Sequence, residues 1–116
     1  MEQSRVMRSM LLDFYGELLT EKQRQCYDLH FNEDLSLAEI AEQCGVSRQG
    51  VWDNIRRAEA ALAEYEEKTG LVRRFLERTR VLGRIEQKVR ELSLLTEGEA
   101  KRIAGEILEE LRAMED

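Results

Sequence analysis

The residues whose types could do chemistry together lie within one short stretch of the chain. They are Ser47, Arg48, Gln49, Trp52, Asp53, Arg56 and Arg57. An arginine can grip guanine O6 and N7 with two hydrogen bonds and a glutamine can do the same for adenine, each worth roughly 1–3 kcal/mol of discrimination. A serine at the start of a helix can help the backbone amides to hold a phosphate. These residue types therefore suit the binding of a nucleic acid.

The later members of this set have different expected roles, and two of them, Trp52 and Asp53, have more than one. Arg56 and Arg57 follow two turns after the helix start, where contacts to backbone phosphates are expected. Trp52 could contact a thymine methyl group or a sugar, or it could lie half-buried against a neighbouring helix. Asp53 could accept a hydrogen bond from cytosine, or it could repel phosphate.

The elements that must position these side chains are two helices joined by a tight turn. Ser36 and Glu39 form a capping box, and Gly45 stands where the first helix must end in a left-handed conformation. Ser47 then caps the second helix. The apolar positions that we expect to point inward are Ile40, Cys44, Val46, Val51 and Ile55. An ordinary helical hairpin would explain the glycine and the apolar spacing but not the second cap and the polar outward set. The stretch therefore predicts a helix-turn-helix, whose second helix enters the major groove.

The rest of the chain predicts an all-α protein of about six helices. Apolar spacing predicts helices over residues 2–19 and 20–31, and the second helix of the turn continues to Gly70. Two more helices follow, the last after an expected capping box of Thr96 with Glu99. We therefore expect a four-helix head over residues 1–70 and a two-helix extension over residues 71–116 that serves packing or dimerisation.

Charge is distributed unevenly along the 116 residues, whose net charge is −6. Residues 1–70 hold 8 Lys/Arg and 14 Asp/Glu, whereas residues 71–90 hold 7 and 2. The seven basic residues of this segment are Arg73, Arg74, Arg78, Arg80, Arg84, Lys88 and Arg90. They could bind RNA or a DNA backbone, or they could pair with the acidic last helix, for which Glu99, Glu106, Glu109 and Glu110 are the candidates. Pairing, within one chain or across a dimer, is the preferred interpretation because the neighbouring acidic segment balances the charge within a few residues.

Several classes of function have no support in the sequence. With one histidine, no glycine-rich phosphate loop and no Ser or Cys beside a plausible base, we expect no enzyme and no cofactor. Cys26 and Cys44 lack metal-ligand spacing and are expected to be buried, reduced thiols. No apolar run could span a membrane, and the N-terminus lacks the layout of a signal peptide. We therefore expect a cytoplasmic protein without a metal site.

Four segments carry a resemblance to a known family. Residues 20–24 (TEKQR), 34–42 (DLSLAEIAE), 45–49 (GVSRQ) and 52–59 (WDNIRRAE) resemble the YlxM family, small bacterial helix-turn-helix proteins usually encoded beside the targeting GTPase of the signal recognition particle. The resemblance implies a dimer, nucleic-acid binding and a regulatory role in that pathway, without catalysis. The head also resembles the promoter-reading domain of sigma factors, and this likeness makes Lys22 and Arg24 candidate contacts to phosphates, with a solvated face as the alternative.

Two functional hypotheses follow. The first is a DNA-binding helix-turn-helix protein that regulates transcription, helped by a second copy or a partner because its head is acidic. The alternative is a helical adaptor that does not bind DNA and docks on the protein or RNA of the signal recognition particle. A homodimer is the preferred assembly, and a monomer whose extension completes the core is the alternative.

Overall fold

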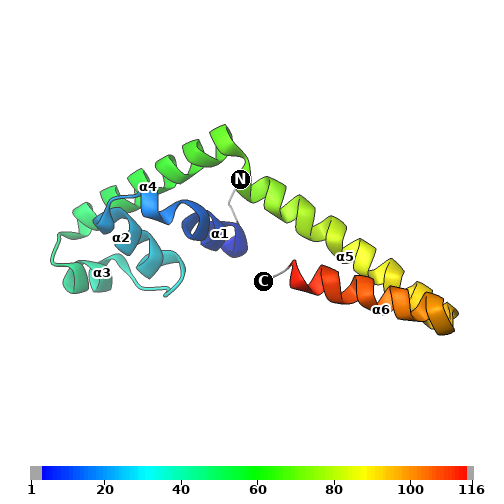
Figure 1. Ribbon diagram of the computed structural model, residues 1–116. Helices are drawn as coiled ribbons and strands as arrows, with labels where there is room; N and C mark the ends of the chain where they lie inside the picture. Colours follow the sequence, from blue (N-terminus) through cyan, green and yellow to red (C-terminus); the bar gives the residue numbers. More distant parts are fainter. Residues whose placement is uncertain (1–3, 115–116) are drawn as a thin grey trace. The chain divides into compact units, whose positions relative to one another are not determined.

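All regular secondary structure of the described chain is helical, which confirms the predicted all-α class. The computed structural model describes residues 4–114, in which six α-helices and one 3₁₀ turn occur and no β-strand does (Figure 1). The elements are α1 (Arg5–Tyr15), η1 (Gly16–Leu18), α2 (Glu21–Phe31), α3 (Leu37–Cys44), α4 (Arg48–Thr69), α5 (Leu71–Leu95) and α6 (Gly98–Ala113). No helix of this described part is both long and apolar enough to cross a membrane.

The first helix is shorter than the expected 2–19, whose first two residues lie outside the described part. Ser4 caps α1 by accepting a hydrogen bond from the Met7 amide at 3.1 Å. The helix ends at Tyr15, and the chain continues through the 3₁₀ turn η1. Two apolar side chains of the segment predicted as one helix, Val6 and Leu18, are 67% and 62% exposed. Leu18 lies in η1, where the chain has already left the α-helix.

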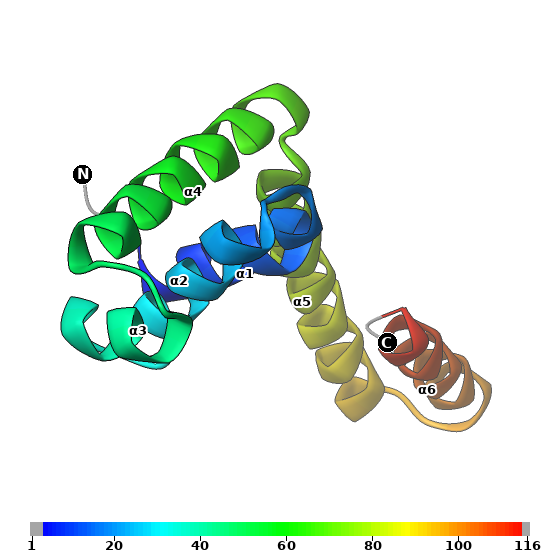
Figure 2. The same cartoon turned by 90° about the vertical axis from the view of Figure 1, so that its left-hand side faces the viewer.

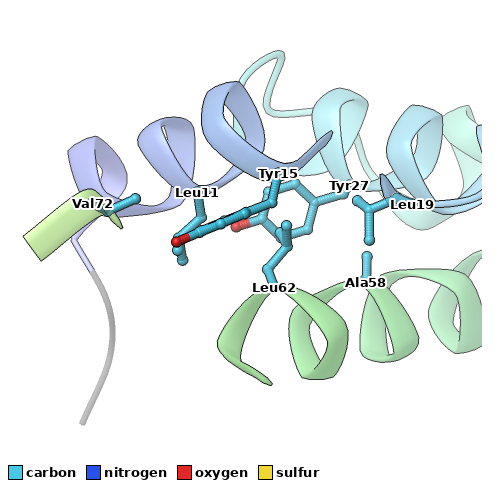
Figure 3. Close-up of a cluster of buried hydrophobic side chains, with 7 residues drawn as sticks. All are labelled: Leu11, Tyr15, Leu19, Tyr27, Ala58, Leu62 and Val72. Carbon is cyan, nitrogen blue, oxygen red and sulfur yellow. The ribbon is translucent and has the colours of Figure 1, made fainter. Parts of the chain in front are cut away.

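Helices α1 to α4 enclose a core made of two clusters of apolar side chains. The first consists of Leu11, Tyr15, Leu19, Tyr27, Ala58, Leu62 and Val72 (Figure 3). The second consists of Cys26, Ile40, Cys44, Val51 and Ile55. Helix α4 contributes to both clusters, so its buried side runs along most of its 22 residues. This length matches the helix predicted as far as Gly70, which ends it with a left-handed φ of 63°.

The contacts divide the chain into two compact units between Arg73 and Arg74. The first turn of α5 belongs to the first unit, since Val72 is fully buried in its core. In the second unit α6 returns antiparallel to α5 (Figure 2). As a result, Met114 lines the same groove as Phe75 and Leu82. Ala104 is the one apolar side chain of the described part of this unit that is almost fully buried, at 2% exposure.

The expected capping box of Thr96 with Glu99 does not form. The Thr96 hydroxyl donates to the Leu92 carbonyl at 2.8 Å, so it closes α5 instead of opening α6. Glu97 takes the N-cap position of α6 without a side-chain hydrogen bond, and Glu99 pairs with Arg102. A threonine at the end of one helix can bond back to the carbonyl four residues earlier, and this local bond competes with capping of the next helix.

Candidate nucleic-acid interface

The turn between α3 and α4 has the predicted geometry. Ser36 and Glu39 exchange both hydrogen bonds of a capping box, at 3.2 and 3.0 Å. Gly45 adopts a φ of 67°, and the amides of Gly45 and Val46 both donate to the Ala41 carbonyl. The Ser47 hydroxyl then accepts from the Gly50 amide at 2.9 Å. Both ends of the turn are therefore held by bonds that lie within a few residues of each other.

Buried apolar contacts hold α3 and α4 against α2. Ile40, Val51 and Ile55 are no more than 2% exposed, and they meet Cys26 of α2. With these residues turned inward, the opposite side of α4 must face solvent, because side chains of a helix repeat every 3.6 residues. The helix-turn-helix is thus part of the folded core and presents one fixed outer surface.

The predicted contact residues of α4 all lie exposed on or beside this outer surface. They are Ser47, Arg48, Gln49, Trp52, Asp53, Arg56 and Arg57. Trp52 is 43% exposed, so it is neither fully buried nor fully solvated. Among the residues that the structure describes, Arg48 and Arg57 take part in no ion pair. Their guanidinium groups can therefore bind an external acceptor without giving up an internal partner.

Two pairs of side chains on this surface interact with each other. The Gln49 amide donates from Nε2 to Asp53 Oδ1 at 3.1 Å. The Arg56 guanidinium lies over the Trp52 ring, with its carbon 5.3 Å from the ring centroid. The first pair occupies one oxygen of the Asp53 carboxylate. In the second, a cation–π contact holds the Arg56 side chain against Trp52 on the helix surface.

The start of α4 also offers backbone donors to an anion. Ser47 satisfies the Gly50 amide, but the amides of Arg48 and Gln49 have no acceptor within the helix. The partial positive charge of a helix N-terminus adds to their attraction for phosphate. The phosphate contact at Ser47 stays a prediction, and the unsatisfied amides of Arg48 and Gln49 are the donors that it would use.

The two candidates on α2 are both exposed but have different neighbours. Lys22 Nζ donates to the Cys44 carbonyl at 2.8 Å, so it caps the C-terminus of α3. An ammonium group has three donors, and two remain for another acceptor. Arg24 is exposed beside a groove that also carries three carboxylates, those of Asp13, Glu21 and Asp28. These carboxylates would oppose the approach of phosphate to Arg24 from that side.

The two cysteines and the histidine have structural roles. Cys26 and Cys44 are free thiols in the second cluster, and burial together with the adjacent Cys44 raises the pKa of Cys26. His30 Nδ1 lies 3.2 Å from the Leu35 carbonyl. Within residues 4–114 no group of three or more potential metal-binding side chains occurs.

Three ion pairs of α5 and α6 each join two residues of the same helix. Arg90 pairs with Glu86 of α5 at 2.6 Å, and Arg102 pairs with Glu99 and Glu106 of α6. Two of the four acidic side chains that were candidates to pair with the basic segment are thus bonded to Arg102. Pairing between the two segments stays a prediction for the other two, Glu109 and Glu110.

Glu66, near the end of α4, has a role that no pattern in the sequence predicted. Its carboxylate accepts from the Tyr15 hydroxyl at 2.6 Å and from the amides of Val72 and Arg73 at 3.0 and 3.1 Å. It therefore caps the start of α5 and ties that helix start to α1. A glutamate four residues before a helix-ending glycine was the available signal, but the tyrosine partner lies 51 residues away.

Comparison with known proteins places the whole head and most of the extension in one family. A family described as "Putative helix-turn-helix protein, YlxM / p13 like" matches residues 1–102. The chain is 53% identical over 81 residues to UPF0122 proteins of Bacillus cereus (strain AH187), Bacillus anthracis (strain A0248) and Bacillus thuringiensis subsp. konkukian (strain 97-27). In each case the match covers 70% of this chain and 74% of the relative. The chain belongs to the YlxM/p13-like family of helix-turn-helix proteins.

Proposed function

We propose that this protein binds duplex DNA through α3 and α4 and regulates transcription. The observation that carries the proposal is the outer surface of α4, where Arg48, Gln49 and Arg57 are exposed on a helix whose start is fixed by the Ser47 cap. An α-helix with its side chains is about 10–12 Å wide, which fits a major groove about 12 Å wide. Its outward residue types match those that recognise base edges and phosphates.

The charge of the molecule predicts that a single copy binds weakly. Residues 1–70 carry 14 acidic and 8 basic side chains, so the long-range field of the head opposes the approach of DNA. Residues 47–57 contain three arginines and one aspartate, so the attraction is confined to the contact surface. A second copy or a partner protein that supplies further contacts would overcome this limit.

A homodimer formed by the extension is part of the proposal. Four isoleucine and valine side chains of this unit are substantially exposed: Val81 at 39%, Ile85 at 41%, Ile103 at 45% and Ile107 at 36%. Exposed apolar surface of this kind supports association with a second copy. Sedimentation of the purified chain should then give twice its 13.6 kDa mass, and Ile85→Glu with Ile103→Glu should return the mass to that of one chain.

The test of DNA binding is a titration with genomic DNA fragments at low and physiological salt. We expect some fragments to bind better than random DNA, and Arg48→Ala to weaken that preference. Binding should also fall with salt, because each phosphate contact releases counterions. If every fragment binds no better than random DNA and Arg48→Ala has no effect, the proposed DNA binding is wrong.

A second candidate function is an adaptor that docks on the protein or RNA of the signal recognition particle. The basic segment of residues 71–90 favours it, because 7 basic side chains against 2 acidic ones form a concentrated positive region in an acidic chain. A pull-down with the particle should retain the protein, and charge reversal at Arg73, Arg74 and Arg78 should release it. Retention of the reversed variant would contradict this candidate.

A further inference from the structure

The side chains of Gln49 and Asp53 lie at the centre of the outward surface of α4. The buried residues of this helix are Val51, Ile55, Ala58 and Leu62, and they define its inner side. At 100° per residue, Gln49 and Asp53 fall on the opposite side, four residues apart and therefore one above the other. A groove that receives α4 along this surface would meet these two side chains first.

The hydrogen bond between them has only one possible polarity. An ionised carboxylate accepts hydrogen bonds and donates none, so the Gln49 amide must donate its N–H to Asp53 Oδ1. This orientation leaves Asp53 Oδ2 and Gln49 Oε1 turned away from the bond. The pair therefore presents mainly acceptor atoms to whatever approaches it, and the bond holds both side chains in place.

The major groove offers few donors to such a pair. Guanine presents the acceptors N7 and O6, and thymine presents O4 and a methyl group. Adenine presents a donor at N6 but carries the acceptor N7 beside it, and this acceptor would face the second oxygen of the carboxylate. Cytosine presents the N4 amino group without an adjacent acceptor of its own. Cytosine is thus the base whose edge complements the pair.

Nearby cations make the approach of a carboxylate to DNA feasible. Arg56 and Arg57 follow Asp53 by three and four residues, so both lie one turn further along the same region of α4. Their charges offset the repulsion between Asp53 and the phosphates on either side of the groove. The carboxylate can therefore be directed at a base while the arginines contact the backbone.

We infer that Gln49 and Asp53 act as one unit that recognises a cytosine in the major groove, with Asp53 accepting from its N4 amino group. This inference rests on the proposed binding of duplex DNA. A single good contact to a base edge discriminates by roughly 1–3 kcal/mol, which corresponds to a preference of about fivefold to 150-fold for cytosine at that position.

The test is a selection of bound molecules from a random pool of duplex DNA, carried out with the full chain and with two variants. Asp53→Asn keeps the shape of the side chain but replaces one acceptor oxygen with a donor. Glu67→Gln, on the exposed surface near the end of the same helix, removes the same charge far from the turn. Equal melting temperatures of the three proteins will show that each is folded.

The natural chain and Glu67→Gln should both enrich a motif with a cytosine at one position. Asp53→Asn should lose that preference by the same fivefold to 150-fold while the rest of the motif stays. The inference is overturned if Asp53→Asn enriches the same cytosine, or if the natural motif contains no position that this variant changes. If the natural chain retains no duplex at all, the proposed function fails as well, so the two failures can be told apart.

Discussion

Replacement of Glu66 by glutamine should destabilise the head, because this one carboxylate joins three elements. It accepts from Tyr15 of α1 and from the amides of Val72 and Arg73 at the start of α5. In Glu66→Gln the two bonds to Oε1 become bonds to a neutral acceptor, while the new amide group places a donor opposite the Arg73 amide. Hydrogen bonds to charged groups contribute about 1.5–3 kcal/mol each, and partial exposure reduces this. We expect a loss of about 1–3 kcal/mol.

The pH dependence of the effect follows from the pKa of Glu66. Partial burial raises this pKa, but the hydrogen bonds from Tyr15, Val72 and Arg73 and the charge of Arg73 outweigh burial and leave it below the ordinary value of 4.5. A carboxyl group whose pKa is lowered by folding stabilises the protein fully above its unfolded pKa, and this contribution is lost as the pH falls through the folded pKa. Glutamine does not titrate, so the stability gap between the two proteins should narrow below pH 4.5.

Tryptophan fluorescence reports on the head, because the one tryptophan of the chain, Trp52, lies in α4. Thermal unfolding followed by tryptophan fluorescence should show a melting temperature about 5–15 °C lower for Glu66→Gln at neutral pH. Glu67→Gln is the matched control, since it removes the same charge from the neighbouring exposed position. Equal melting temperatures for Glu66→Gln and the natural chain, or a gap that stays constant down to acidic pH, would refute the assigned role of Glu66.

Substitutions at three further positions, with Leu71→Ala as the control for one of them, test other contacts of the first compact unit by the same fluorescence measurement. Gly45→Ala should cost about 1 kcal/mol, because φ is 67° and no atom lies within 4 Å of an added Cβ, so only the backbone conformation is unfavourable; an unchanged stability would contradict this. Val72→Ala should cost about 2 kcal/mol because Val72 is fully buried, whereas Leu71→Ala, at a position 42% exposed, should cost clearly less. Lys22→Met should cost about 1 kcal/mol through the loss of its bond to the Cys44 carbonyl, and a variant as stable as the natural chain would show that this bond is not needed.

The extent of agreement between sequence and structure differs from one element to the next. The boundaries of α3 and α4 follow from Ser36, Gly45, Ser47 and Gly70, since a cap and a left-handed glycine act on atoms three to five residues away. The same reasoning gave a wrong prediction at Thr96. Its hydroxyl could cap the next helix or donate to the carbonyl four residues earlier, and it donates to the Leu92 carbonyl. Patterns of capping residues therefore predict a helix end well only where a single local bond can satisfy the side chain.

The exposed residues of α4 were predictable, but the bonds among them were not. Spacing alone places Gln49 and Asp53 on one face of the helix. That Gln49 donates to Asp53, and that Arg56 lies over Trp52, depends on side-chain conformations that the sequence leaves open. The sequence thus predicts which residues make up the candidate site but not how their side chains contact one another.

By itself, the sequence determined the all-α class, the helix-turn-helix and the face of α4 that carries the polar residues, because periodicity and capping are properties of neighbouring residues. Only the tertiary structure decided that Lys22 caps α3 and that Glu66 joins α1, α4 and the start of α5. The contacts of Lys22 with Cys44 and of Tyr15 with Glu66 join residues that are 22 and 51 positions apart. The physical reason is that such partners meet only after the buried faces of α1, α2 and α4 have packed. A pattern of neighbouring residues does not say which distant residues that packing brings together.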